Sequence, residues 1–201
     1  MRLSVIVLLD TPQDFATCEA ELGCAAEQLL TPLTRRYRQR PLDYFAIDNG
    51  AYSNFKEKEF RALLSREYYA RHLCRFVCCP DIVGAAMRTI ELFNHYKHEL
   101  KDWPLALVAQ DGLENIQIPW NEIKAIFIGG STQWKTSKYA EDICRTGRIL
   151  GKWIHIGRVN TRQRFEWAAK FADSCDGTGI SRYTEMRLNI GRENKQIPIF
   201  N

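Results

Sequence analysis

Short apolar runs alternate with helical patterns along the 201 residues, and this alternation predicts an α/β fold. Most of these runs are almost continuously apolar, which is typical of strands that are buried on both faces of a parallel sheet. Their starts fall about 20–40 residues apart, the scale of one strand–helix unit. Seven or eight such units in one chain predict a compact (β/α)8 barrel of the TIM type rather than an open sheet.

The expected strands are rich in β-branched and aromatic residues. In chain order they are Leu3–Leu9, Tyr44–Asp48, Arg75–Cys79, Leu105–Ala109, Ala125–Ile128, Trp153–Ile156 and Ser174–Asp176. A short apolar run at Ile197–Phe200 is a candidate for an eighth strand. The first run looks like the start of a signal peptide, but it stops at Asp10 and no small-residue cleavage site follows. We therefore expect it to be a buried first strand.

The segments between these strands show helical spacing of apolar residues. They predict helices at about Gln13–Leu30, Lys56–His72, Val83–Leu100, Lys135–Leu150 and Thr161–Ala172. In the third segment, Met87, Ile90 and Phe93 recur at the spacing of one helix face. Thr161 is expected to cap the last helix, because its hydroxyl can accept a hydrogen bond from an N–H group of the first turn.

The composition is that of an ordinary globular protein. Hydrophobic residues make up 45% and charged residues 26%, which excludes disordered, collagen-like and coiled-coil chains. No linker or low-complexity segment interrupts the chain, so we expect a single domain over residues 1–201. No apolar stretch approaches the roughly 20 residues of a membrane span, and no membrane partner is expected. The length is short for this kind of barrel, which typically takes about 250 residues.

The cysteines and the charge restrict the remaining classes. None of the seven cysteines has CxxC or CxC spacing, so we expect buried reduced thiols, no metal and a cytoplasmic location. No GxxxxGK[ST] or GxGxxG motif occurs, and no nucleotide cofactor is expected. The net charge of +4 permits a nucleic-acid partner without requiring one. Basic clusters at 35–40, 158–164 and 182–192 favour such a partner.

Polar residues follow the expected strands at their carboxyl ends, where active sites lie in parallel α/β folds. These residues are Asp48, Asp81, Gln110, Gly129–Gly130 and Asp176. Two or three carboxylates around a pocket suit chemistry through an oxocarbenium-like centre, because one can attack an anomeric carbon while another transfers a proton. This predicts glycosyl transfer or hydrolysis at a sugar or a nucleoside.

Two features at the strand ends remain open. His155 has no obvious partner, and no Cys/His/Asp nucleophile arrangement is apparent. Gly129–Gly130 permit three interpretations: a turn needed for backbone geometry, contact with a phosphate, or contact with the edge of a base.

The order of these motifs resembles that of the tRNA-guanine transglycosylase superfamily, closest to its DNA-directed and often virus-borne branch. The best match runs from Gly157-Arg158-Val159 through a helix to Asp176 and then Ser181-Arg182. The run from Ile47 to Tyr52 is similar to the family's Asp-Ser-Gly-Gly-Phe motif. Val108–Gly112 is similar to the strand whose glutamine reads the base, and Gly129–Gly130 to the family's double glycine. The resemblance covers roughly residues 44 to 182.

The resemblance implies a barrel that exchanges guanine for a 7-deazaguanine, a queuosine-related base, through a covalent aspartyl–sugar intermediate. It makes Asp176 the nucleophile and Asp48 the proton-transfer carboxylate. The implied base-binding residues are Asp81, Gln110, Gly129, Gly130, Tyr52 and Asn49, with the Gly130 N–H facing a base carbonyl. The implied phosphate-binding residues are Arg158, Arg162, Arg164, Arg182 and Arg187. Tyr52, Trp134 and Tyr183 are the expected stacking partners of an extruded base.

The chain also departs from the family's tRNA enzymes. Those enzymes carry a CxCxxC…H zinc site in a C-terminal insertion, and we expect a barrel lacking this zinc-binding subdomain, which favours DNA over tRNA. The family's Pro-Thr-Arg after the nucleophile is replaced by Gly177-Thr178-Gly179-Ile180-Ser181-Arg182. A partner protein, a homodimer and a viral origin with action in a host cytoplasm stay open. So do three other functions: exchange on RNA, a small-molecule nucleoside deoxyribosyltransferase or N-glycosidase, and a nucleic-acid-binding barrel without catalysis.

Overall fold

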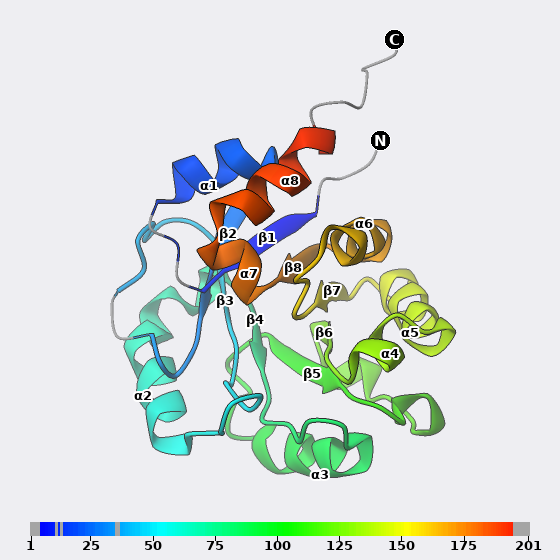
Figure 1. Cartoon of the computed structure of the whole chain (residues 1–201). Helices are drawn as coiled ribbons and strands as arrows, with labels where there is room; N and C mark the ends of the chain where they lie inside the picture. Colours follow the sequence, from blue (N-terminus) through cyan, green and yellow to red (C-terminus); the bar gives the residue numbers. More distant parts are fainter. Residues whose placement is uncertain (1–4, 11, 13, 35–36, 195–201) are drawn as a thin grey trace.

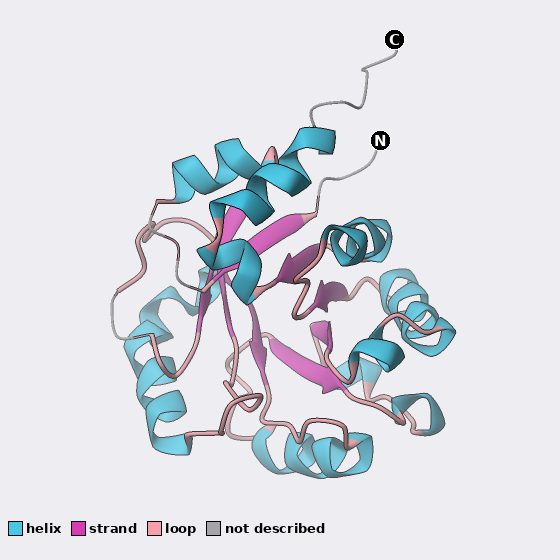
Figure 2. Ribbon diagram, viewed as in Figure 1, coloured by secondary structure: helices cyan, strands magenta, loops and turns pink. Residues whose placement is uncertain are grey.

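Eight parallel strands close into a barrel in the computed structural model, which describes residues 5–10, 12, 14–34 and 37–194 (Figure 1). Each strand pairs with the next in the chain, and the last strand pairs with the first. Helices surround the ring of strands (Figure 2). The predicted (β/α)8 fold is therefore confirmed.

The strands are short. They are β1 Ile6–Leu9, β2 Ala26–Leu30, β3 Phe45–Ile47, β4 Cys74–Cys78, β5 Leu105–Ala109, β6 Ala125–Ile128, β7 Trp153–Ile156 and β8 Ser174–Asp176. The helix expected at Gln13–Leu30 is confirmed only over Phe15–Leu22, because the chain leaves the helix at Gly23, whose left-handed φ is 68°, and continues into β2. Pairing of β2 with both β1 and β3 overrides the helix-favouring residues of this segment. Ile197–Phe200 lies outside the described residues.

The helices are α1 Phe15–Leu22, α2 Glu57–Glu67, α3 Ala86–Tyr96, α4 Thr132–Lys135, α5 Lys138–Ile149, α6 Arg162–Phe171, α7 Thr178–Arg182 and α8 Thr184–Asn194, with 3-10 turns η1 Tyr68–Leu73, η2 Leu113–Asn115 and η3 Trp120–Glu122. Helices α2, α3, α5 and α6 follow predicted segments with shifted ends, whereas α7 and α8 were not predicted. Thr161 caps α6 as predicted, since its side chain accepts from the Arg164 N–H. The helix expected at Lys135–Leu150 begins later, as α5, because Ser137 caps it, and the short α4 before it has its own cap, Ser131.

Side chains of each strand alternate between the interior of the barrel and the surrounding helices. Leu9, Ile47 and other outward residues pack in the layer beneath the helices, whereas Leu8, Ala46, Phe76, Val108 and Phe127 belong to the cluster that fills the interior. At the carboxyl ends of the strands the inward series continues into polar residues or glycine. This alternation directs the side chains at the strand ends into the mouth of the barrel.

Two further observations concern the chain as a whole. All seven cysteines are free thiols, and all except Cys24 are buried. No helix in the described ranges is both long and apolar enough to cross a bilayer.

Candidate functional site

A single pocket in the mouth of the barrel contains all the residues predicted to be catalytic or base-binding. Its lining consists of Asp48, Asn49, Tyr52, Cys78, Asp81, Val83, Val108, Gln110, Phe127, Gly129, Gly130, Arg158 and Asp176. These residues come from the carboxyl ends of six strands, β3 to β8, and from the loops that follow them. Inward positions on separate strands thus converge on one site.

Asp176 ends β8, and its carboxylate is held through one oxygen. His155 Nε2 lies 3.1 Å from Asp176 Oδ1, and the backbone N–H of Arg158 donates to the same oxygen at 3.2 Å. Among the described residues, no hydrogen bond engages Oδ2. The carboxylate is therefore fixed through Oδ1, which leaves Oδ2 available to attack a carbon in the pocket.

His155 is held by a buried chain of polar groups inside the barrel. Trp153 Nε1 donates to Ser174 Oγ at 2.8 Å, and Ser174 Oγ lies 2.8 Å from His155 Nδ1. A carboxylate can only accept a hydrogen bond, so His155 Nε2 carries a proton and donates to Asp176 Oδ1. The Ser174 hydroxyl, which has one donor and two acceptor sites, can serve both the Trp153 indole and His155 Nδ1.

These contacts correct the expectation that His155 stands without a partner. His155 and Ser174 occupy inward positions, two residues before Gly157 and Asp176 respectively. The two-residue period of a strand is the signal that could have placed the histidine beside Asp176.

Asp48 follows β3 in an environment that disfavours its charged form. Burial raises the pKa of Asp48 to about 7, and repulsion from Asp176, Asp81 and Asp10 acts in the same direction. The Gly50 N–H, which donates to Asp48 Oδ1 at 2.7 Å, opposes that rise in pKa. A carboxyl group that titrates near neutral pH can both give and take a proton, as a proton-transfer group must.

Asp81 lies at the centre of a buried hydrogen-bond network. Asn49 Nδ2 donates to Oδ1 at 2.8 Å, and Gln110 Nε2 donates to Oδ2 at 2.7 Å. Burial raises the pKa of Asp81, and these two hydrogen bonds oppose the rise. Gln110 Oε1 in turn accepts from the N–H groups of Gly84 and Gly130, at 2.9 and 3.0 Å. The Gly130 N–H expected to face a base carbonyl is therefore engaged by Gln110.

Both residues of the double glycine lie where a side chain would collide with the site. A Cβ atom on Gly129 would be 2.9 Å from Gln110 Nε2. On Gly130, whose φ is +67°, it would be 2.7 Å from both Asp111 Oδ2 and Trp134 Cε3. Packing and turn geometry thus require these glycines, and contact with a ligand stays a prediction.

Arg158 crosses the mouth of the pocket. Its guanidinium donates to the Gly130 carbonyl and lies 4.4 Å from the centre of the Tyr52 ring, a cation–π contact. Arg158 is the one non-glycine residue with a positive φ, 58°, in the described part of the chain. The arginine that was expected to bind phosphate thus lines the pocket in the barrel mouth.

The other predicted phosphate-binding arginines fall into two groups. Arg162 and Arg182 are exposed and Arg164 is half-buried, all on the α6–α7 side of the mouth. Arg187 is buried, and its phosphate-binding role is wrong. Its guanidinium pairs with Glu21 and donates to the carbonyls of Ile180 and Ser181, so it fastens α8 to α1 and α7.

Trp134 is also misassigned as a stacking residue. Its side chain is buried, and its indole N–H donates to Glu114 Oε2 at 2.8 Å. Tyr52 and Tyr183 are exposed at 67% and 63%, and both remain candidates for stacking.

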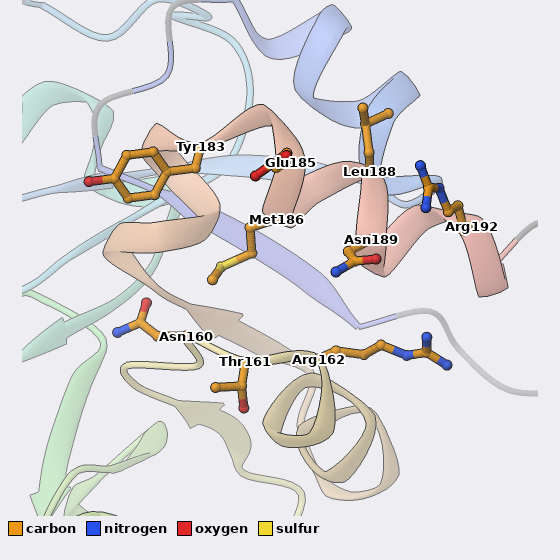
Figure 3. A pocket seen from close by; sticks show the side chains of 9 residues that line it. All are labelled: Asn160, Thr161, Arg162, Tyr183, Glu185, Met186, Leu188, Asn189 and Arg192. Atoms are coloured by element: carbon orange, nitrogen blue, oxygen red, sulfur yellow. The ribbon is translucent and has the colours of Figure 1, made fainter.

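A second cavity, of about 650 Å³, opens between α6 and α8 (Figure 3). Its lining consists of Asn160, Thr161, Arg162, Tyr183, Glu185, Met186, Leu188, Asn189 and Arg192. Asn160 joins this α6–α8 groove to the segment that follows Asp176, since its Oδ1 accepts from the Gly179 N–H at 3.0 Å. Gly179 comes three residues after Asp176. The groove combines two arginines and an exposed tyrosine with a single carboxylate.

Lys135 is a functional candidate that no sequence pattern indicates. It ends α4, is only 3% exposed, and donates from Nζ to the Gly157 carbonyl. Burial and the positive charge of Arg158 lower the pKa of Lys135 to about 7, whereas Asp176 opposes that shift. Its burial depends on contacts between elements that are far apart in the chain.

No cluster of three or more His, Cys, Asp or Glu side chains among the described residues could hold a metal ion.

No protein-family model and no curated protein matches the chain. Among solved structures, a protein from Aquifex aeolicus VF5 is similar with a TM-score of 0.48 and 12% identity, over 96% of this chain and 92% of that chain. An HpcH/HpaI aldolase from Desulfitobacterium hafniense DCB-2 is similar with a TM-score of 0.43 and 14% identity, over 98% and 95%. Likeness this distant carries no argument about function. The resemblance to transglycosylases stays a prediction, and the function has to be inferred from the pocket itself.

Proposed function

We propose that this protein is a base-exchange enzyme that replaces guanine by a 7-deazaguanine derivative in DNA, through a covalent bond between Asp176 and the sugar. The observation that carries the proposal is the composition of the pocket in the barrel mouth. It combines a carboxylate held through one oxygen, a second carboxyl group with its pKa near 7 because of burial, and a buried amide–carboxylate network.

In the first half-reaction Asp176 Oδ2 bonds to C1′ of the target nucleotide while the C1′–N9 bond breaks. The electron pair of that bond leaves with guanine, which takes a proton from protonated Asp48. In the second half-reaction the incoming base returns its N9 proton to Asp48 and bonds to C1′, and Asp176 leaves as a carboxylate. One proton is thus given and recovered, and no further reactant is needed.

Recognition of the base uses the polar network around Asp81. A guanine-like edge presents N–H donors at N1 and the 2-amino group, which suit the Asp81 carboxylate, and a carbonyl, which suits Gln110 Nε2 and the Gly130 N–H. The same groups bond to one another in this structure, so a bound base would exchange those bonds for its own. Arg158 and Tyr52 would have to part to admit it.

A polymeric substrate is favoured by the α6–α8 groove. Arg162 and Arg192 carry positive charge along it, and exposed Tyr183 offers a ring for stacking close to the nucleophile. The target nucleotide would leave its stack to reach Asp176, and the flanking strand would lie along the groove. Affinity for DNA should therefore fall as the salt concentration rises.

The test is incubation with a guanine-containing DNA oligonucleotide and a labelled deazaguanine, followed by nucleoside mass spectrometry. Wild-type protein is expected to incorporate the label and to form a complex with DNA that survives denaturing electrophoresis. Asp176→Asn should do neither, whereas Asp142→Asn, a control on exposed α5, should match wild type. Exchange in a tRNA transcript but not in DNA, or guanine release from free deoxyguanosine only, would contradict the DNA assignment.

A further inference from the structure

We propose that Lys135 is a positioning residue that acts on Asp176 through the peptide group between Gly157 and Arg158. The carbonyl of that peptide accepts from Lys135 Nζ, and its N–H donates to Asp176 Oδ1 at 3.2 Å. One peptide group therefore connects the lysine to the carboxylate. The inference rests on the proposed function, in which Asp176 is the nucleophile.

The position of Lys135 distinguishes this role from direct chemistry. The side chain is buried at 3% exposure, yet it does not line the pocket that contains the carboxylates. Its amine meets the Gly157 carbonyl instead. This placement, outside the pocket lining and against a backbone carbonyl, favours an effect through the peptide over a Schiff base with a substrate carbonyl.

This peptide group needs to be held, because its conformation is unusual. Arg158 has a φ of 58°, in the left-handed region that residues other than glycine rarely adopt. Gly157 lies so close to its neighbours that an added Cβ would be 2.5 Å from Phe127 and 3.2 Å from Asp176 Oδ1. On the other side, the Val159 N–H donates to the Asp176 carbonyl at 2.6 Å. Lys135 supplies the remaining contact, on the carbonyl oxygen.

The held peptide has two effects on the site. It aims the Arg158 N–H at Asp176 Oδ1, and it directs the Arg158 side chain across the pocket to the Gly130 carbonyl. A donor on the carbonyl also polarises the peptide and so strengthens the hydrogen bond that its N–H gives to the carboxylate. Together with His155 on the same oxygen, this keeps Oδ2 turned toward the pocket.

Four charged side chains, from different segments of the chain, act on Lys135. Arg158 and Arg164 repel its ammonium form, while Asp176 and Asp111 attract it. Removal of the lysine would leave the Gly157 carbonyl buried without its donor and would allow Arg158 to relax to a negative φ. Asp176 would then lose one of the two hydrogen bonds that hold Oδ1.

The experiment compares Lys135→Met, Lys135→Arg and a control, Lys138→Met, which removes an exposed lysine of α5. Base exchange is measured from pH 5 to 9, and the Asp176 carboxyl is titrated by ¹³C NMR in the free protein. Lys135→Met should lower kcat by about 10- to 100-fold, with KM changed by less than about threefold. It should also move the NMR midpoint of Asp176 to higher pH, and Lys135→Arg should recover part of both.

Several outcomes decide the matter. An unchanged kcat and NMR midpoint in Lys135→Met, or a raised KM with kcat unchanged, would overturn the positioning role. A shifted midpoint in a protein that exchanges no base would support the coupling and reject the proposed function. If Lys135→Met does not fold, Lys135→Gln, which keeps a donor of shorter reach, is measured in the same way and should fall between Lys135→Met and Lys135→Arg.

Discussion

The two ends of the barrel differ in how their charged side chains are paired. At the amino-terminal end of the strands, the Arg75 guanidinium contacts two aromatic rings and an opposite charge. Its guanidinium lies 3.7 Å from the centre of the Tyr44 ring and 4.7 Å from that of Trp153, and it pairs with both oxygens of Glu27 at 2.7 and 3.1 Å. At the carboxyl end, Asp48, Asp81 and Asp176 share one pocket, and burial raises the pKa of Asp48 to about 7.

The difference separates stability from chemistry within one sheet. Arg75 is paired with a carboxylate and stacked on two rings, so it serves the fold and is not placed to react. Carboxyl groups that repel one another are poised to bond to carbon or to move a proton, at a cost in folding free energy. Substitutions at the carboxyl end should therefore reduce activity with little loss of stability, and substitutions at the amino-terminal end should do the reverse.

Asp176→Asn is expected to have the largest effect. An amide oxygen is a poor nucleophile, so exchange should fall by more than about 1,000-fold and the covalent complex should disappear. The thermal midpoint should stay within a few degrees of wild type, because the amide can keep the contacts to His155 and to the Arg158 N–H. Exchange rates and a thermal melting curve measure the two expected effects. If the Asp176→Asn variant still forms the covalent complex with DNA, Asp176 is not the nucleophile.

Asp48→Asn should lower exchange by about 100- to 1,000-fold and abolish the activity change near pH 7 that belongs to this carboxyl. Its effect on stability has the opposite sign. Because burial raises the pKa of Asp48 from 3.8 to about 7, folding takes up a proton between these values, and wild-type stability falls as pH rises through them. The variant should be more stable than wild type at pH 8 and closer to it at pH 4.

Urea unfolding of Asp48→Asn at the two pH values measures that difference. Equal stabilities of the variant and wild type at pH 8 would show that Asp48 carries no burial penalty.

Arg75→Ala tests the amino-terminal end. It leaves Glu27, which is largely buried, without its cation, and should cost about 2 kcal/mol of the free energy of unfolding. Exchange per folded molecule should be unchanged, since Arg75 lies at the opposite end of the strands from the pocket. Arg88→Ala, at an exposed arginine, is the control in the same urea titration. A large loss of kcat in a folded Arg75→Ala variant would contradict the assignment of stability to the amino-terminal end and activity to the carboxyl end.

Arg192→Gln should have the smallest effect. Loss of one cation from the α6–α8 groove should weaken DNA binding a few-fold and reduce the slope of log affinity against log salt by about one. Affinity measured at several salt concentrations gives this slope directly. The kcat of exchange should not change, and an unchanged salt dependence would remove Arg192 from the DNA path.

Much of the site could be predicted because its residues lie directly after recognisable strands. Asp48, Gln110 and Asp176 each follow an inward-facing strand residue by two positions, so the alternation that builds the interior also directs them into the mouth. The barrel itself follows from the spacing of the apolar runs.

What could not be predicted depends on contacts between distant segments. β2 has helix-favouring residues, and only its pairing with β1 and β3 makes it a strand. Arg187 looks like a surface cation, and only the packing of α8 on α1, 166 residues away in the chain, buries it against Glu21 (Figure 1). Lys135 likewise becomes a buried partner of Gly157 only when the end of α4 meets the loop that follows β7.

The closure of the barrel has a consequence for the order in which the site is assembled. Asp176 lies in the last strand, and its partner across the closing seam is Leu8 in the first. During synthesis Asp48 and Asp81 emerge long before Asp176, and the Asp10 N–H contacts Ser181 Oγ only after residues from both sides of the seam have met. Under the proposed function, a nascent chain would therefore have no complete reactive centre until its last strand has paired with its first, a contact between distant segments of the kind that forms slowly.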